Sequence, residues 1–349
     1  MKTIKNFIKK LLLVDEGPKP LFFRPEIKYR SSKNYKDFEI KEYGDLNPDK
    51  IFYIIKRSSY AGIFSYLAFV LNHLVIAKKN NFIPFVDMEN YVSPYNEKDK
   101  ITGLSNSWEY YFRNVSNFTI DEIYKSKNVI LSRDDFHSKM RYQIHLEKKF
   151  VEFKNKNIFL KDKYYNFLNK YVLDNNLNNL KVLGIHFRGT SYKTSRGHIF
   201  PATIKQMEKH INKLQDEENF DKIFLCTEEI NYLKYFKKKF PDKLLYLNSF
   251  RSNKNNAFKI YPRNQHRYLL GDEAIKETLI LSKCHSLLYV RSNIINSANY
   301  FSDKKQNLYE IFNGFNSRNQ FIARWLWFVK KKFPKKMFGF KDEIIKLIN

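Results

Sequence analysis

The sequence predicts an α/β fold with parallel sheets, divided into two domains. Its second half alternates short apolar runs with helical patterns, and polar residues follow the runs where strands would end. Its first half contains one strand–loop–helix–strand unit of the same kind. A length of 349 residues favours two domains over one. The polar break at 174–179 is the predicted boundary, and an apolar share of 43% is ample for a core on each side of it.

The first half predicts a single β–α–β unit. A strand at 51–55 is followed by a loop, an apolar helix at 63–79 and a second strand at 82–86. Such a connection predicts parallel pairing of the two strands. The loop before the helix could hold an anion at the helix N-terminus. Residues 21–49 are polar and weakly patterned, and no element is predicted there.

Two carboxylates, Asp87 and Glu89, follow the second predicted strand. They could serve as acid and base at a strand end. The alternative is that they cap the turn that follows. The aromatic run 108–112 likewise has two interpretations, a platform on which a sugar stacks or, more commonly, core packing.

After the boundary, strands and helices alternate regularly. Strands are expected at 181–187, 222–226, 244–247, 286–290 and 308–311. Helices are expected at 201–216 and 271–283, and two more are expected to end near residue 240 and to begin near residue 294. This alternation predicts a doubly wound parallel sheet.

Three of these strands end in polar residues that could meet at one sheet edge. The pairs are His186 with Arg188, Thr227 with Glu228, and Ser292 with Asn293. In open α/β sheets ligands bind outside the carboxyl ends of the strands. The planar guanidinium of an Arg matches a phosphate, and the helix that begins after Ser292 could add backbone N–H donors. The alternative for Arg188 is a surface pairing with a carboxylate.

Both ends of the chain combine apolar and basic residues. The segment 1–20 predicts a short amphipathic helix, and 316–349 predicts a helical tail with Trp325, Trp327 and a lysine cluster. Such segments suit an anionic membrane surface, or else they pack on the body with a solvated basic face. No apolar run reaches 18 residues, so no spanning helix is expected. The start lacks the pattern of a signal peptide. The sequence therefore predicts a cytoplasmic protein that could lie on the inner face of the membrane.

The composition narrows the class of partner. The formal net charge of +27 indicates an anionic partner, such as nucleic acid, an acidic membrane or a phosphorylated ligand, unless it reflects compositional drift. The two cysteines, Cys226 and Cys284, have no metal-ligand spacing and fit a reducing compartment. No metal site is expected.

Three motifs resemble those of the inverting fucosyltransferases that have a GT-B fold and use GDP-fucose. The motifs are 185–190 (IHFRGT), 224–229 (FLCTEE) and 277–293. The family includes α1,6-fucosyltransferases of N-glycan cores, Nod-factor fucosyltransferases and related bacterial polysaccharide enzymes. The resemblance implies two Rossmann-like domains facing a cleft. The acceptor side would be 45–176 and the nucleotide-sugar side 180–315.

The resemblance also implies roles for individual residues. Arg188 would bind the donor diphosphate, His186 and Glu277 the guanine, and Ser292 with Asn293 the phosphate oxygens. Gly189, Thr227 and Glu228 belong to the same binding motifs. The α1,6 enzymes have a second Arg where this chain has Gly189 and an acid where it has Ser191, and their proposed catalytic acid has no counterpart in 194–198. Donor binding is therefore carried over better than acceptor choice.

The predicted function is an inverting, metal-independent glycosyltransferase. It would move fucose or a related sugar from a GDP-sugar to a glycan or lipid-linked glycan acceptor in bacterial surface polysaccharide synthesis. Arg188 would stabilise the leaving GDP, and Glu89, Asp87 and His198 are the candidate bases. Two alternatives stay open: a basic nucleic-acid-binding protein, and a transferase of the same fold that uses another donor such as GDP-heptose.

Overall fold

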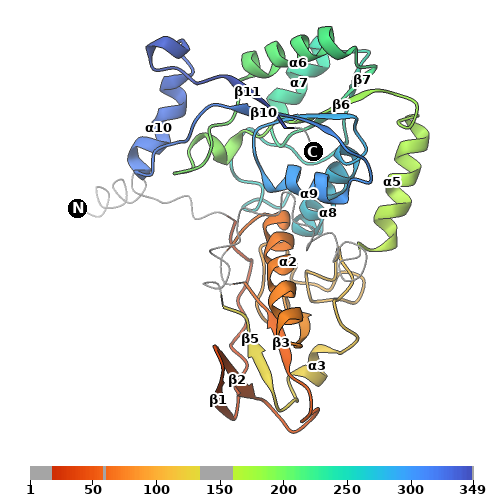
Figure 1. Ribbon diagram of the computed structural model, residues 1–349, viewed down its shortest axis with the longest axis vertical. Coiled ribbons are helices and arrows are strands. Elements are labelled where there is room, and N and C mark those ends of the chain that lie inside the picture. The colour runs from red at the N-terminus through yellow and green to blue at the C-terminus, as the bar shows by residue number, and fades with distance from the viewer. Residues whose placement is uncertain (1–17, 58–59, 134–159, 348–349) are drawn as a thin grey trace. The chain divides into compact units, whose positions relative to one another are not determined.

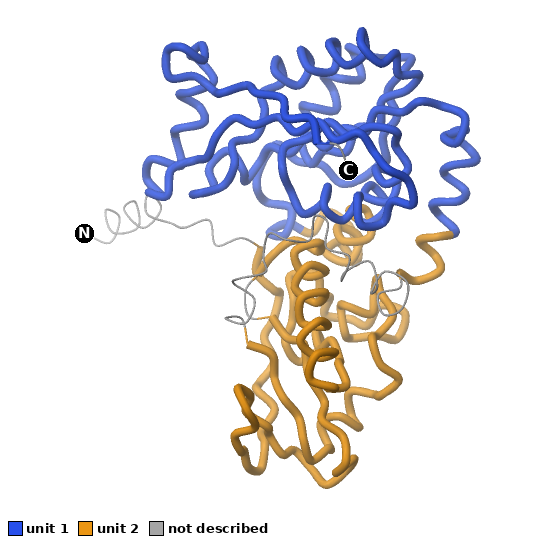
Figure 2. The backbone as a smooth tube through the Cα atoms, in the orientation of Figure 1, with its two compact units in different colours: residues 1–16, 166–260, 275–349 blue, residues 17–165, 261–274 orange. Residues whose placement is uncertain are grey.

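The computed structural model describes residues 18–57, 60–133 and 160–347, and the chain forms two compact units (Figures 1 and 2). Unit 1 contains residues 166–260 and 275–349, and unit 2 contains 17–165 and 261–274. Compared with the predicted range 45–176, unit 2 also includes residues 17–44 and 261–274, and it ends at residue 165. The predicted N-terminal amphipathic helix lies outside the described residues.

Unit 2 is built on a five-stranded mixed sheet in the order β1-β2-β5-β3-β4. Its strands are β1 (Ser31–Tyr35), β2 (Phe38–Glu42), β3 (Phe52–Ile55), β4 (Ile83–Val86) and β5 (Val129–Leu131), and its helices are α2 (Ile63–Lys79) and α3 (Ile120–Ile123). The predicted β–α–β unit is confirmed, because β3 pairs with β4 in parallel and α2 has the predicted bounds. Strand β3 also pairs in parallel with β5, whereas β1 and β2 are antiparallel.

The apolar residues of β3 and α2 explain why this unit was visible in the sequence. All four residues of β3 are buried, as expected of a parallel strand covered on both faces. The Tyr53 hydroxyl lies 2.7 Å from Nδ1 of His73, which joins β3 to α2 in the core. The strands β1, β2 and β5 were missed. Strand β1 is mostly exposed and polar, and β5 has only three residues.

Unit 1 is built on a six-stranded sheet in the order β11-β10-β9-β6-β7-β8. Its strands are β6 (Val182–His186), β7 (Lys222–Cys226), β8 (Leu244–Leu245), β9 (Ser286–Tyr289), β10 (Asn307–Phe312) and β11 (Glu343–Leu347). All neighbours pair in parallel except β11, which is antiparallel to β10. The order β8-β7-β6-β9-β10 is that of a doubly wound sheet, and the direction of winding reverses between β6 and β9.

Helices lie on both sides of this sheet (Figure 1). The helices are α5 (Asp162–Asp174), α6 (Ile204–Glu218), α7 (Ile230–Lys239), α8 (His266–Leu281), α9 (Asn293–Phe301) and α10 (Gln320–Lys330), with the 3₁₀ turns η2 (Thr190–Lys193) and η3 (Lys335–Met337). The first residues of α5 and of α8 belong to unit 2. Leu183, Ile185 and Phe187 pack with α6 and α7 in one core cluster. Because side chains alternate along a strand, Gly184 and His186 face the other side. A Cβ on Gly184 would lie 2.9 Å from a Leu281 methyl, so α8 packs closely there.

Two predictions about the second half need correction. Helix α8 begins at His266, five residues before the predicted start. The tail is not wholly helical: after α10 and η3, strand β11 pairs with β10. The Asp342 carboxylate fixes the start of β11 to α6, accepting from Lys209 Nζ at 2.6 Å and lying 2.8 Å from His210 Nε2. Across the described ranges, none of the helices has the length and apolarity needed to cross a membrane.

Candidate functional site

The carboxyl ends of β7, β6 and β9 lie side by side in unit 1. His186, the last residue of β6, is opposite Cys226 of β7 and Tyr289 of β9 in the two parallel registers. The residues that follow these strands therefore meet at one edge of the sheet. This edge includes the reversal between β6 and β9, where open α/β sheets bind ligands.

His186 and Ser292 meet at that reversal. The Ser292 hydroxyl lies 3.1 Å from Nδ1 of His186, and both residues are buried. Burial, with a smaller contribution from the positive charge of Arg188, lowers the pKa of His186 to about 3, so the imidazole is neutral. Ser292 is also the N-cap of α9, where its hydroxyl accepts from the Ile295 amide at 3.4 Å. Asn293 is the first residue of α9 and is partly exposed.

Arg188 lies just beyond β6, and its side chain is partly exposed with Nε buried. The guanidinium carbon is 4.1 Å from the centre of the Tyr192 ring, a cation–π contact. Its Nε is 3.7 Å from Oε2 of Glu228, and 28% of the side chain is exposed. The alternative interpretation of Arg188 as an ion-pair partner is thus partly correct. An anionic ligand can still reach the exposed part of the side chain.

Two glutamates hold the loop that follows β6. The Glu228 carboxylate accepts from the Thr190 hydroxyl and, at 3.4 Å, from the Gly189 amide. The Glu229 carboxylate accepts from the Thr190 amide and from Lys193 Nζ at 2.5 Å. A Cβ on Gly189 would lie 1.9 Å from Oε1 of Glu229. A residue with a side chain therefore cannot replace Gly189 without moving the buried Glu229 carboxylate.

Thr227 joins the ends of β6 and β7. Its hydroxyl donates to the Phe187 carbonyl at 2.7 Å and accepts from the Glu229 amide at 3.2 Å. The hydroxyl is therefore used within the protein. Thr227 positions the site rather than offering its hydroxyl to a ligand.

Glu277 on α8 is held by a buried polar cluster. Its Oε1 accepts from Arg251 at 3.0 Å and from the Ser249 hydroxyl at 3.0 Å, and Oε2 lies 3.3 Å from the Cys226 sulfur. The Arg251 side chain is only 2% exposed. Burial, reinforced by the charge of Glu277, raises the pKa of the Cys226 thiol, which keeps it protonated.

Arg251 was missed from the sequence. No local pattern connects an Arg with a Glu 26 residues later. The one indication of such a residue in the sequence is Glu277 itself, since a carboxylate buried on a helix requires a hydrogen-bonding or charged partner.

The three candidate bases lie in different surroundings. Asp87 is fully buried, and its carboxylate accepts from the Glu89 amide, the Asn90 amide and side chain, and the Tyr124 hydroxyl at 2.7–3.0 Å. Asp87 therefore caps the turn after β4, as the alternative stated, and its position does not suit a base. Glu89 is partly exposed and pairs with Arg24 at 3.1 Å. His198 is exposed, with its ring 5.1 Å from that of Tyr192.

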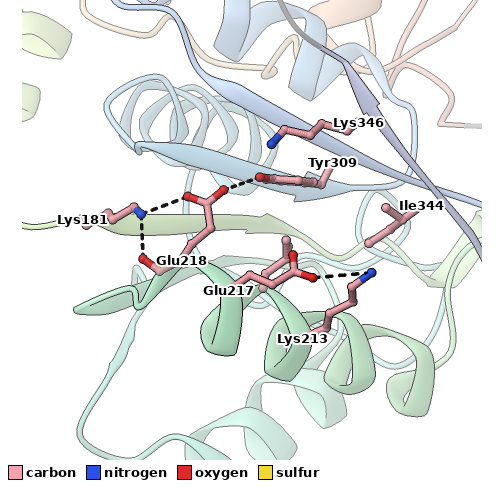
Figure 3. A pocket seen from close by; sticks show the side chains of 8 residues that line it. Lys181, Lys213, Glu217, Glu218, Tyr309, Ile344 and Lys346 are labelled. Carbon is pink, nitrogen blue, oxygen red and sulfur yellow. Dashed lines mark hydrogen bonds and ion pairs between the residues drawn. The ribbon is translucent and has the colours of Figure 1, made fainter.

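A cavity of 440 Å³ lies at the opposite end of the unit 1 sheet (Figure 3). It is lined by Lys181, Lys213, Leu214, Glu217, Glu218, Tyr309, Ile344 and Lys346. Four of its five charged side chains pair with one another, Lys181 with Glu218 at 3.0 Å and Lys213 with Glu217 at 3.7 Å, and Lys346 lies over the Tyr309 ring. We assign it no ligand.

Among residues 18–57, 60–133 and 160–347, no three His, Cys, Asp or Glu side chains come together as metal ligands would.

No protein-family model and no curated protein matches this sequence. Solved structures do match its fold. A structure of the fucosyltransferase NodZ from Bradyrhizobium is 12% identical, with 86% of this chain and 99% of that one covered and a TM-score of 0.50. A NodZ α-1,6-fucosyltransferase soaked with GDP-fucose is 15% identical over 75% of this chain and 95% of that one, also with a TM-score of 0.50. The predicted fucosyltransferase-like GT-B fold is therefore confirmed.

Proposed function

We propose that this protein is a glycosyltransferase that binds a GDP-sugar at the carboxyl edge of the unit 1 sheet. The observation that carries the proposal is the junction of His186 and Ser292 at the reversal between β6 and β9, with Arg188 beside it. The protein soaked with GDP-fucose has a similar fold. Since fold alone does not determine function, the assignment depends on these side chains.

The diphosphate of the donor would lie between Arg188 and the N-terminus of α9. The first amides of a helix have no acceptor within the helix, and the helix dipole favours an anion there. Ser292 occupies the cap, which leaves the amides of Asn293 and Ile294 oriented toward a ligand. The guanidinium of Arg188, supported by the Tyr192 ring, would supply the positive charge.

The guanine would be bound near His186 and Glu277. A carboxylate is an acceptor, and the exocyclic amino group of guanine is a donor that adenine lacks at that position. Arg251 and Ser249 fix the Glu277 carboxylate. The cluster thus offers a rigid acceptor to the base.

In the proposed reaction, an acceptor hydroxyl attacks the anomeric carbon as the bond to GDP breaks, with inversion through an oxocarbenium-like state. The proton of the hydroxyl passes to a base, and the leaving GDP gains negative charge. Arg188 and the α9 amides would stabilise that charge without requiring a metal ion. Glu89 and His198 remain the candidate bases. The base is the residue whose replacement, Glu89→Gln or His198→Ala, removes the acidic limb of the pH profile of kcat, because a base loses its function when it is protonated.

The finer assignment concerns the sugar and the setting. The motifs favour fucose or a related sugar, and a glycan or lipid-linked glycan acceptor in bacterial surface polysaccharide synthesis. GDP-heptose is the alternative donor. We place the protein in the cytoplasm, peripheral to the inner face of the membrane. Turnover with a panel of GDP-sugars decides between the donors.

The test is thermal stabilisation by GDP, UDP, CMP, ADP and GMP, with and without Mg²⁺. A ligand that binds only the folded state raises the midpoint by mass action. We expect a shift with GDP that does not depend on Mg²⁺ and is lost in Arg188→Ala. Arg188→Ala should also lower turnover on the order of 10² to 10³-fold. Arg196→Ala, which removes an exposed Arg from the same loop, is the control and should keep both properties.

The other outcomes are equally informative. A shift with UDP alone would retain a transferase and discard GDP as the donor. No shift with any nucleotide would contradict the donor site. The net charge of +27 would then favour nucleic-acid binding, with a steep dependence on salt.

A further inference from the structure

The face of α10 that points to solvent is apolar. Phe321, Ile322, Trp325, Phe328 and Val329 are exposed, by 38% to 59%. The spacing of Phe321, Trp325 and Phe328 places them on one side of the helix. Soluble helices usually have the opposite arrangement, with apolar residues toward the core.

The inward face of α10 is firmly held. Ala323 and Trp327 are buried, and Trp327 packs in a cluster with Phe200 and Phe340. The Trp327 indole donates to the Pro201 carbonyl at 2.9 Å, and the Asn319 side chain caps the helix. The orientation of α10 is therefore fixed by packing, and its apolar face is exposed as a consequence.

The exposed face continues beyond the helix. Phe333, Met337 and Phe338 are exposed by 45% to 64%, and a groove of 580 Å³ runs along Trp325, Phe328 and Phe333. We call the following residues the α10 patch: Phe321, Ile322, Trp325, Phe328, Val329, Phe333, Met337 and Phe338. An exposed set of this size marks an interaction site.

The segment that carries the α10 patch is strongly basic, and of its lysines Lys335 pairs with Glu343 at 3.1 Å. The segment from Gln320 to Lys341 contains no acidic residue, and lysines occupy positions 330, 331, 332, 335 and 336. Lys330 lies 4.1 Å from the Phe338 ring centre and Lys331 5.5 Å from that of Phe328, so the cations adjoin the apolar surface. Trp, Phe and Lys side by side suit the headgroup region of a bilayer, where rings enter the interface and lysines meet anionic phosphates.

We propose that the α10 patch docks the protein on the surface of a bilayer that contains anionic lipid. The aromatic side chains enter the headgroup region, and the neighbouring lysines bind lipid phosphates. The helix lies on the membrane and does not cross it, which agrees with its length of 11 residues. This inference does not depend on the proposed transferase activity.

The full chain itself carries the reporter for a test. Of its three tryptophans, Trp108 and Trp327 are buried and Trp325 is 59% exposed. Vesicles of 70% phosphatidylcholine and 30% phosphatidylglycerol should shift the Trp325 emission to the blue and carry the protein into the pellet on sedimentation. Vesicles of phosphatidylcholine alone should bind far less. In Trp325→Phe, the blue shift should disappear while sedimentation persists.

Matched variants separate the apolar and the charged contributions. The double variant Phe321→Ser with Phe328→Ser should lower the partition coefficient of the protein onto anionic vesicles, on the order of tenfold for each aromatic side chain removed. Lys331→Gln with Lys332→Gln should lower it roughly fivefold for each lysine. The controls are Leu173→Ser, an exposed apolar residue on α5, and Lys234→Gln with Lys238→Gln on α7, which should change nothing.

Three results would overturn the inference. One is equal binding to neutral and anionic vesicles. Another is unchanged binding in the α10 variants. The third is a wild-type protein that fails to bind vesicles but forms a dimer that Phe321→Ser with Phe328→Ser dissociates, which would make the α10 patch an interface between copies of this chain.

Discussion

At the scale of single residues, Gly189 makes a testable contribution to the site. The methyl group that alanine would add at this position collides with the Glu229 carboxylate. Gly189→Ala should release Glu229 from Thr190 and Lys193, at about 1–3 kcal/mol of stability, and raise the KM for the donor. Urea unfolding and donor titration measure the two effects.

Two controls accompany this prediction. Gly62→Ala meets only the Tyr95 hydroxyl, at 4.0 Å, and should cost less than about 1 kcal/mol, from the poorer N-cap that alanine gives α2. In a Glu229→Ala background, Gly189→Ala should cost less than in the wild type, because the nearest colliding group is gone and only the Tyr232 ring, at 3.0 Å, remains close. An undiminished cost in that background would show that Gly189 acts through something other than Glu229.

His186 makes stability depend on pH. Its pKa is lowered from 6.5 to about 3 by burial and by Arg188, so below pH 6.5 the unfolded chain takes up a proton that the folded chain does not. The resulting stability is complete above pH 6.5 and declines as the pH falls toward 3. Between pH 7 and pH 5 the loss from this group is about 2 kcal/mol.

The measurement is the free energy of unfolding against pH for the wild type, His186→Asn and His198→Asn. The decline should be shallower in His186→Asn only. If both variants kept the wild-type slope, His186 would not be held neutral in the folded protein.

The positions of the candidate site residues could be predicted from the sequence more readily than their hydrogen-bonding and ion-pair partners. His186, Arg188 and Ser292 follow apolar strands, so their position at the sheet edge could be predicted from chain order. Arg251 could not, because its ion pair with Glu277 forms only when the loop folds over α8. The surroundings of Asp87 could not be predicted for a related reason, since one of the four hydrogen bonds that its carboxylate accepts comes from Tyr124, 37 residues away.

At the scale of secondary-structure elements, the start of α9 differs from other helix starts in having a second role. Ser292 caps α9 and contacts His186, whereas Thr203 caps α6 through a capping box with Gln206 only. Thr203→Ala should cost about 1 kcal/mol. Ser292→Ala should cost more, because it also leaves the buried His186 nitrogen without this partner.

Donor binding distinguishes the two caps. The thermal shift produced by GDP should be reduced in Ser292→Ala and preserved in Thr203→Ala. Equal shifts in both would mean that the α9 N-terminus does not contact the donor.

Elements with strong apolar patterns were predicted well. Helix α2 and strand β7 have the predicted bounds because their runs are long, buried and interrupted sharply. Strands β1 and β11 were missed because most of their residues are exposed, so alternation carries little signal. Each is an antiparallel edge strand, and pairing with β2 or β10 defines it more than its own side chains do.

At the scale of the whole molecule, the presence of two α/β units could be predicted from the sequence, but the residues that form each unit could not. Residues 261–274 belong to unit 2 because Arg267 and Tyr268 donate their amides to Glu97 at 2.7 and 3.1 Å, across about 170 residues of sequence. Tyr261 also bonds to Glu97. Contacts between residues so far apart produce no hydrophobic periodicity in the sequence. Residues 261–274 were therefore predicted to belong to the same domain as the residues next to them in the chain.

The division into units predicts where the donor acts. His186, Arg188, Thr227, Glu277 and Ser292 all belong to unit 1. GDP should therefore slow amide hydrogen exchange after β6 and β7 and at the start of α9, and leave the sheet of unit 2 unchanged. The cavity of Figure 3 is an internal control, since its lining residues occupy the opposite end of the same sheet. Peptides covering 212–220 and 342–347 should exchange as in the free protein. Protection there, with none around 186–193, would move the nucleotide to that cavity and leave Arg188 without its proposed role.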